Sequence, residues 1–339
     1  MSYEKNLNLE FQWKALQQIL IFYLAVLFSV SELVSPSKRA LVCNFTWVLF
    51  ACGYFFLAFI AKLITNWRVL QLVIALVYVP VIVLSVIFIP ESPRWLVSKR
   101  RLTDAEKILK KIANFNNKQM TGNIMKSLDE IEKTDTSEIK GSLKDFIRSR
   151  TGVLIVINLS FNWAVQSMLY YGLSLSTSTL GIDPHISFMV SGAIEIPAYI
   201  LCMFVPNWYG RKTSTLVTML MAGICCCLTP ALPSGLGRAL FAMSGKFFVT
   251  MSFSVVFIWS VEVVPTSLRS SGLGWFSTAS RLGGILVPLL LILDEVWDSL
   301  PVVLFGTLAI VAGLLCLLLP ETKGKPLPST MEDIEKLYR

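Results

Sequence analysis

Long stretches without a charged side chain constrain this chain more than any other feature. Six runs contain no Asp, Glu, Lys or Arg: residues 15–31, 40–61, 69–90, 151–182, 213–237 and 299–320. Three further apolar stretches are each interrupted by one charge, at Glu195, Lys246 or Arg281. A helix needs about 20 apolar residues to cross a bilayer, and a soluble core cannot bury so many runs of this length. The sequence therefore predicts an all-α membrane protein with about nine transmembrane helices.

The positions of the charges follow membrane topology rather than a nucleic-acid surface. The net charge is +8, but only 15% of the residues are charged, against about a quarter in a soluble domain. Residues 91–150 hold 14 Lys and Arg against 9 Asp and Glu. Because positively charged loops stay on the cytoplasmic side, we expect residues 91–150 and the C-terminal tail in the cytoplasm. The predicted partner is the lipid bilayer, and no nucleic acid is expected.

The sequence offers no cluster suited to metal binding or catalysis. Its seven cysteines lie in apolar segments, without a CxxC pair, and it has one histidine. Small soft side chains of this kind pack into apolar interiors, so neither a metal site nor a disulfide framework is predicted. No nucleophile with a base and no phosphate-binding loop is visible. We therefore expect no enzyme activity and no cofactor.

An internal repeat divides the chain into two related parts. Residues 32–39 (ELVSPSKR) return as residues 262–269 (EVVPTSLR), and residues 90–93 (PESP) return as residues 320–323 (PETK), both at an offset of 230 residues. A constant offset in a hydrophobic chain is typical of a two-halved transporter. Four predicted spans precede this element in the second half, whereas one precedes it in the first. The equivalents of three helices are therefore expected to lie before residue 1.

The repeat and the charges together predict four parts. These are a partial N-terminal transmembrane bundle (1–90), a cytoplasmic linker (91–150), a six-helix transmembrane bundle (151–320) and a cytoplasmic tail (321–339). In the linker, Thr103 and Glu106 have capping-box spacing, and Ile108, Leu109 and Ile112 recur at helical spacing. This predicts a short amphipathic helix on the cytoplasmic ends of the bundle or on lipid headgroups. A solvated spacer is the alternative.

Six short segments form a recognisable combination. They are residues 90–96 (PESPRWL), 170–175 (YYGLSL), 195–198 (EIPA), 262–272 (EVVPTSLRSSG), 277–283 (STASRLG) and 319–324 (LPETKG). Together they resemble the organic cation, organic anion and carnitine transporter family (solute carrier family 22) of the major facilitator superfamily. The resemblance covers about Ser31 to Glu335. It implies transport of a small organic ion by alternating access, in an integral membrane protein of the plasma membrane.

The chain also departs from that family's pattern. The family's first three helices and its large cysteine-bearing extracellular loop have no counterpart here. Asn207 stands where the related loop often has Asp. A second interpretation therefore stays open, in which the chain is a shortened, inactive relative that acts only by associating with a full-length transporter.

Three charges inside predicted spans are the leading candidates for a substrate site. A charge at the bilayer centre costs at least ~3 kcal/mol, so Glu195, Lys246 and Arg281 should face a partner or a pathway. Either Glu195 pairs with Lys246 or Arg281, or all three line a substrate site, and both hold if a pair opens when substrate arrives. The Arg281 guanidinium suits a carboxylate or sulfate. In the resemblance, a basic residue at this place implies handling of anions or zwitterions.

Aromatic and amide side chains add to this candidate site. The fourth predicted span carries Trp163, Gln166, Tyr170 and Tyr171 at near-helical spacing, and Phe257 lies on the seventh. Aromatic faces bind organic cations and stack on planar anions, but they also serve as packing or lipid-facing residues. Gln166 favours a substrate site, because an amide facing lipid is costly.

The repeated Glu…Arg elements predict a gate. Glu32, Arg39, Glu262 and Arg269 lie at expected cytoplasmic helix ends. We expect inter-helix salt bridges there that close the inner side and break on opening. Charges that only reach toward the interface are the alternative.

Overall fold

The computed structural model describes residues 36–88, 90–91, 93–98, 101–117, 146, 148–176, 184–232, 236–265, 268–297, 299–325, 328 and 331–338. Within them the chain is helical and has no strand. It forms two compact units: Met1–Thr46 with Phe59–Ile139, and Trp47–Ala58 with Lys140–Arg339. The predicted first span, 15–31, and most of the linker beyond residue 117 lie outside the described residues.

The second unit contains the main helical bundle. Its helices are α8 (Arg150–Ser176), α9 (Pro184–Cys202), α10 (Val205–Tyr209), α11 (Arg211–Leu228), α12 (Leu236–Val263), α13 (Arg269–Leu291), α14 (Leu300–Leu315) and α15 (Met331–Tyr338), with short 3-10 turns η2 (Thr229–Ala231), η4 (Ile292–Glu295) and η5 (Cys316–Leu318). Six helices among the described residues are long and apolar enough to cross a membrane, and all six lie in this unit. The predicted all-α membrane fold is confirmed.

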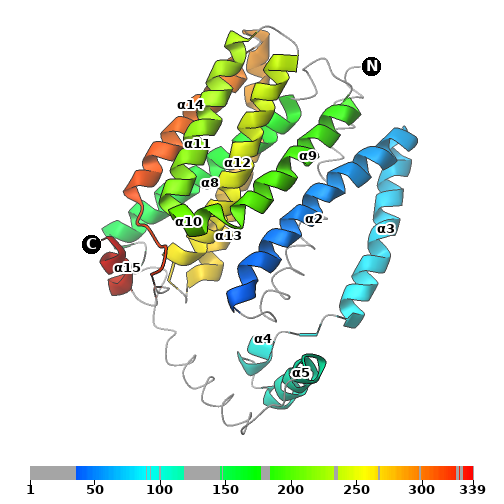
Figure 1. The fold of residues 1–339 in the computed structure, drawn as a ribbon, viewed down its shortest axis with the longest axis vertical. Coiled ribbons are helices and arrows are strands. Elements are labelled where there is room, and N and C mark those ends of the chain that lie inside the picture. The colour runs from blue at the N-terminus through cyan, green and yellow to red at the C-terminus, as the bar shows by residue number, and fades with distance from the viewer. Residues whose placement is uncertain are drawn as a thin grey trace. The chain divides into compact units, whose positions relative to one another are not determined.

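Helix α8 is central in this bundle. It packs against α12, α13 and α14, while α11 packs against α12 and α14, and α9 packs against α12. Figure 1 shows α11 and α14 lying side by side. The close approach of these two helices depends on glycine, because a Cβ added at Gly223 would lie 2.7 Å from the Gly306 carbonyl oxygen. Small residues let membrane helices approach closely enough for dispersion contacts to hold them together.

Polar side chains inside the bundle are tied to backbone or to each other. The Asn158 amide on α8 donates to the Leu315 carbonyl at the end of α14 (2.6 Å), and the Asn162 amide donates to Asn158 Oδ1 (2.9 Å). The Cys316 thiol donates to Asn162 Oδ1 (3.2 Å). An unbonded polar group in an apolar interior costs several kcal/mol, roughly 2–7, so this chain of bonds fixes α8 against α14.

Helix α2 (Pro36–Leu63) contributes its middle to the second unit. Ala51, Tyr54 and Ala58 recur at helical spacing and are 0–3% exposed. A Cβ at Gly192 of α9 would lie 2.6 Å from Tyr54 Cβ. The Trp47 ring stacks on the Tyr199 ring of α9, with centroids 5.9 Å apart. A helix predicted to belong to the first bundle therefore packs directly against α9.

The first unit contains α3 (Trp67–Phe88), α4 (Pro93–Ser98) and α5 (Leu102–Phe115). The predicted amphipathic helix is α5, but the predicted capping box is wrong. Arg101 is the N-cap residue and no side chain caps the helix. Thr103 already lies within the first turn, and the Glu106 carboxylate pairs with Lys110 (2.8 Å) instead of reaching back.

Candidate functional site

A fully buried ion pair lies between α9 and α12. The Lys246 ammonium donates to Glu195 Oε1 at 2.8 Å, and both side chains are 0% exposed. The cost of desolvating two charges is offset only if further hydrogen bonds complete their coordination. Ser191, one turn before Glu195, accepts a second hydrogen bond from Lys246.

Two tyrosines complete the surroundings of this pair. The Tyr170 hydroxyl of α8 donates to Glu195 Oε1 (2.9 Å), and the Tyr54 and Tyr170 hydroxyl oxygens are 2.7 Å apart. The Lys246 Nζ atom lies 5.2 Å from the Tyr54 ring centroid and 5.1 Å from that of Tyr170. A desolvated ammonium gains about 2 kcal/mol from such a ring face. Helices α2, α8, α9 and α12 therefore meet at one charged cluster, which we call the ion-pair cluster: Tyr54, Tyr170, Ser191, Glu195 and Lys246.

Sequence reasoning missed two members of the ion-pair cluster: Ser191, which lies one turn before Glu195, and Tyr54. The segment of Tyr54, 40–61, carries no charge to mark it as more than a membrane span. The available signal was the helical repeat of Ala51, Tyr54 and Ala58, two small residues flanking one polar aromatic. That spacing is typical of a helix face that packs closely on another helix.

Beside the cluster, buried polar atoms lack a hydrogen-bond partner among the described residues. Gln166, one turn before Tyr170 on α8, is 0% exposed, and neither its amide nitrogen nor its amide oxygen is bonded. The same holds for Ser167 Oγ, for Thr250 Oγ1 on α12 and for Glu195 Oε2. Each such buried group costs about 1–3 kcal/mol when unmet. These atoms can bond a polar molecule that reaches this level of the bundle.

Arg281 does not belong to the ion-pair cluster. Of the two partners that the sequence left open for Glu195, the structure selects Lys246. Arg281 lies exposed on α13 and has no ion pair with a described residue. Tyr171 connects the two places, because its ring lies 3.3 Å from a Cβ added at Gly284 of α13 and packs edge-on against the Tyr170 ring, with centroids 5.4 Å apart.

Trp163 and Phe257 lie in a separate aromatic group. The Trp163 ring is 5% exposed and has Phe253, Phe257 and Phe276 around it, with centroids 5.5, 5.8 and 6.2 Å away. Its indole nitrogen donates to Ser260 Oγ (2.9 Å). This geometry holds α8, α12 and α13 together, and contact of these two side chains with a substrate stays a prediction.

A second charged cluster lies where α11 begins. Arg211 binds the Glu262 carboxylate through two hydrogen bonds of 3.0 Å, and the Thr322 hydroxyl donates to the same carboxylate (2.5 Å). The Glu321 carboxylate accepts the backbone N–H groups of Arg211 (2.9 Å) and Lys212 (3.0 Å). A carboxylate at a helix N-terminus satisfies free N–H groups and complements the helix dipole.

The predicted gate residues are only partly found in this second cluster. Glu262 pairs with Arg211 and not with Arg269, whose Nε donates to the Val261 carbonyl oxygen (2.8 Å). Glu32 lies outside the described residues, and so does the side chain of Arg39. Their role in gating stays a prediction.

The geometry defines a polytopic helical membrane protein with a charged cluster inside one bundle, and its fold is that of the major facilitator superfamily. The xylose symporter XylE bound to 6-bromo-6-deoxy-D-glucose superposes with a TM-score of 0.66 at 21% identity, over 92% of this chain and 70% of that chain. Inward-open XylE from E. coli gives a TM-score of 0.65 at 20% identity, over 92% and 68%. The predicted major facilitator fold is thus confirmed.

The sequence family described as sugar (and other) transporter matches residues 21–334, and the chain belongs to that family. The chain is 38% identical to the organic cation transporter protein of Drosophila melanogaster, over 90% of this chain and 57% of the relative. It is 35% identical to human solute carrier family 22 member 13 (90% and 55%) and 34% identical to mouse solute carrier family 22 member 3 (91% and 56%). The predicted resemblance is confirmed. The chain spans a little over half the length of these relatives.

Proposed function

We propose that the chain moves small organic ions across a membrane by alternating access. The observation that carries this proposal is the fully buried Glu195–Lys246 pair beside the unbonded Gln166 amide. Two opposite charges inside a membrane bundle match a ligand that itself carries charge. The names of the curated relatives agree with a substrate of this class. The plasma membrane is the proposed location.

The proposed substrate residues fall into two groups. Glu195, Lys246, Tyr170 and Gln166 supply opposite charges, a hydroxyl and an amide within one part of the bundle. Arg281 of α13 supplies a cation, and Tyr171 of α8 supplies a ring that packs next to α13. Trp163 and Phe257 belong to the separate aromatic group. Two cations against one carboxylate favour a zwitterion or an anion over a simple cation. A guanidinium in particular binds a carboxylate through two parallel hydrogen bonds.

Uptake by proteoliposomes that contain only this chain tests the proposal. A betaine-type zwitterion, an aromatic monocarboxylate and a tetraalkylammonium ion would be compared with empty vesicles. We expect uptake of the zwitterion or the anion. Arg281→Ala should reduce anion uptake at least tenfold while Arg68→Ala, an exposed arginine outside the site, leaves it unchanged. Unchanged anion uptake in Arg281→Ala would refute the role of Arg281.

The second candidate function is association with a full-length relative. It is favoured by the exposed Arg281 on α13. A membrane helix that presents a charge needs a partner that shields it from lipid. If the chain alone gives no uptake above empty vesicles, co-purification with a full-length relative, lost in Arg281→Ala, would support this function.

A further inference from the structure

A basic segment begins directly after α3. Residues 94–118 contain eight Lys and Arg against two acidic residues. Helix α3 ends at Phe88 and α4 begins at Pro93. Five residues of chain span at most about 17 Å. The segment is therefore tethered close to the membrane surface into which α3 leads, a distance comparable with the ~10 Å over which surface charge acts.

Helix α5 has two distinct faces. Its apolar face is already covered, because Ala105 is fully buried and Leu102, Ile108 and Leu109 pack with it against Leu96 and Val97 of α4. Phe115 at the C-terminal end of α5 is 89% exposed, but along the rest of the helix little apolar surface is left to insert into a bilayer. Docking along the length of α5 therefore depends on its other face.

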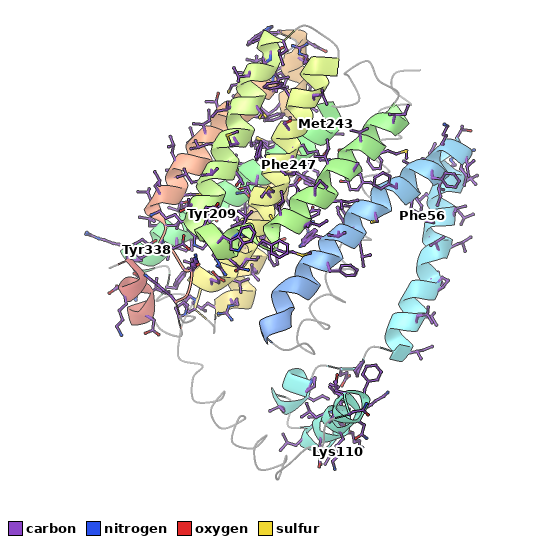
Figure 2. All side chains as sticks on the ribbon, viewed as in Figure 1. Phe56, Lys110, Tyr209, Met243, Phe247 and Tyr338 are labelled. Atoms are coloured by element: carbon purple, nitrogen blue, oxygen red, sulfur yellow. The ribbon has the colours of Figure 1, made fainter. Side chains whose placement is uncertain are left out.

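The opposite face of α5 is cationic. At 100° per residue, the positions opposite Ala105 are Thr103, Lys107, Lys110, Lys111 and Asn114, and all five are exposed. We call this the outer face of α5. Figure 2 labels Lys110 on this helix. The outer face carries no acidic residue, since Asp104 and Glu106 lie on its flanks and are only half exposed.

The ion pairs of α5 do not neutralise this face. Lys107 contacts Asp104 (3.3 Å) and Lys110 contacts Glu106 (2.8 Å), but the lysine side chains are 77% and 59% exposed. Exposed pairs of this kind contribute little to stability and exchange readily with another anion. Lys111 forms no ion pair with a described residue.

We propose that the outer face of α5 docks onto anionic lipid headgroups of the cytoplasmic leaflet. The inference uses the cytoplasmic placement of residues 91–150 that the charge distribution predicts. A polybasic helix next to a transmembrane segment is attracted by the negative surface potential of that leaflet. Because the apolar face is covered by α4, docking is electrostatic and sensitive to salt rather than driven by insertion.

Hydrogen exchange of the full chain in nanodiscs tests this docking. The amides of residues 102–115 would be compared in phosphatidylcholine discs and in discs that also contain phosphatidylserine. We expect slower exchange with phosphatidylserine, and loss of that difference in high salt. Lys107→Gln/Lys110→Gln/Lys111→Gln should abolish it, since each lysine contributes about fivefold to the docking equilibrium and the three together roughly a hundredfold.

A matched lysine provides the control. Lys336 of α15 resembles Lys107, with 71% exposure and an i,i+3 contact to an aspartate, Asp333. Lys336→Gln should leave the exchange of residues 102–115 unchanged in both discs, whereas Lys107→Gln should reduce the phosphatidylserine effect about fivefold. Exchange of the triple variant in phosphatidylcholine discs shows whether α5 still folds. Equal exchange of the parent chain in the two kinds of disc would overturn the proposal, and so would a triple variant that folds and keeps the lipid effect.

Discussion

Replacing Lys246 by methionine removes one charge from a pair that has no contact with solvent. The carboxylate of Glu195 then keeps its hydrogen bond from Tyr170 but loses the ammonium at 2.8 Å. Breaking a buried pair by removing one partner costs about 3–5 kcal/mol, because the remaining charge stays in an apolar interior. The lost contacts of the ammonium with two tyrosine rings add to this. The free energy of unfolding of Lys246→Met should therefore fall by about 4 kcal/mol.

The double variant Glu195→Gln/Lys246→Met separates the cost of an uncompensated charge from the cost of lost packing. Replacing both members of a buried pair by uncharged side chains of similar volume is often neutral or stabilising. The double variant should accordingly recover most of the loss, within about 1 kcal/mol of the parent chain. Glu195→Gln alone leaves the ammonium unpaired and should cost about 3–5 kcal/mol as well. The interaction energy in the double-mutant cycle should therefore exceed about 3 kcal/mol in magnitude, well above the ~0.5 kcal/mol of independent sites.

Equilibrium unfolding of the purified chain in mixed micelles, followed by tryptophan fluorescence, measures these differences. Arg68→Met serves as the control for loss of an exposed cation and should change the unfolding free energy by less than about 0.5 kcal/mol. A loss below about 1 kcal/mol in Lys246→Met would contradict the buried pair. So would a double variant that is less stable than either single variant, because the charges would then not be compensating each other.

Three smaller perturbations probe the packing of the second unit. Tyr54→Phe removes one buried hydroxyl and should cost about 1 kcal/mol in the same unfolding assay. Gly283→Ala places a Cβ against the carbonyl oxygen of Ala164 on α8 and should cost about 2–3 kcal/mol, since backbone cannot give way as a side chain can. Gly210→Ala should cost about 2 kcal/mol and weaken the cap of α11, because Gly210 has φ +91° and a Cβ there meets the Glu321 carboxylate. Hydrogen exchange of the first turn of α11 measures that cap.

The sequence predicted the six membrane spans of the second unit well because their signal is local. A run of about 20 residues without charge is rarely anything other than a membrane-spanning helix. Each of the six spans in the second unit falls on such a run or on one interrupted by Glu195, Lys246 or Arg281. The capping box at Thr103 failed for an equally local reason. The backbone turn between α4 and α5, with the Arg101 N–H bonded to the Leu96 carbonyl (2.9 Å), starts the helix before the threonine.

Partner choice was not predictable because it depends on the register between helices. Sequence spacing left Glu195 with two candidate cations, and the contact of α9 with α12 selects Lys246. The repeat likewise marked Glu262 and Arg269 as gate residues without fixing which charges pair. The structure instead brings in Arg211 from the start of α11, 51 residues earlier in the chain. Both partners lie on other helices, and the hydrophobic pattern does not fix how those helices are rotated about their own axes.

Helix α12 contributes a residue to each of the two charged clusters, so the distance between them along the helix follows from its geometry. Lys246 and Glu262 lie 16 residues apart on one continuous helix, which corresponds to about 24 Å along its axis. Glu262 is next to the last residue of α12, whereas Lys246 lies ten residues, about 15 Å, after its first residue. One cluster therefore lies at the end of the helix and the other well inside it. At Lys246 the helix contacts α2, α8 and α9, and at Glu262 it contacts α11 and the start of the tail. Because α12 is one continuous helix, a rigid tilt that relaxes the contacts of Lys246 would also act on the contacts of Glu262. If a charged ligand competes for Glu195 or Lys246, as proposed above, a rigid displacement of α12 by that ligand would also reach the contact between Arg211 and Glu262.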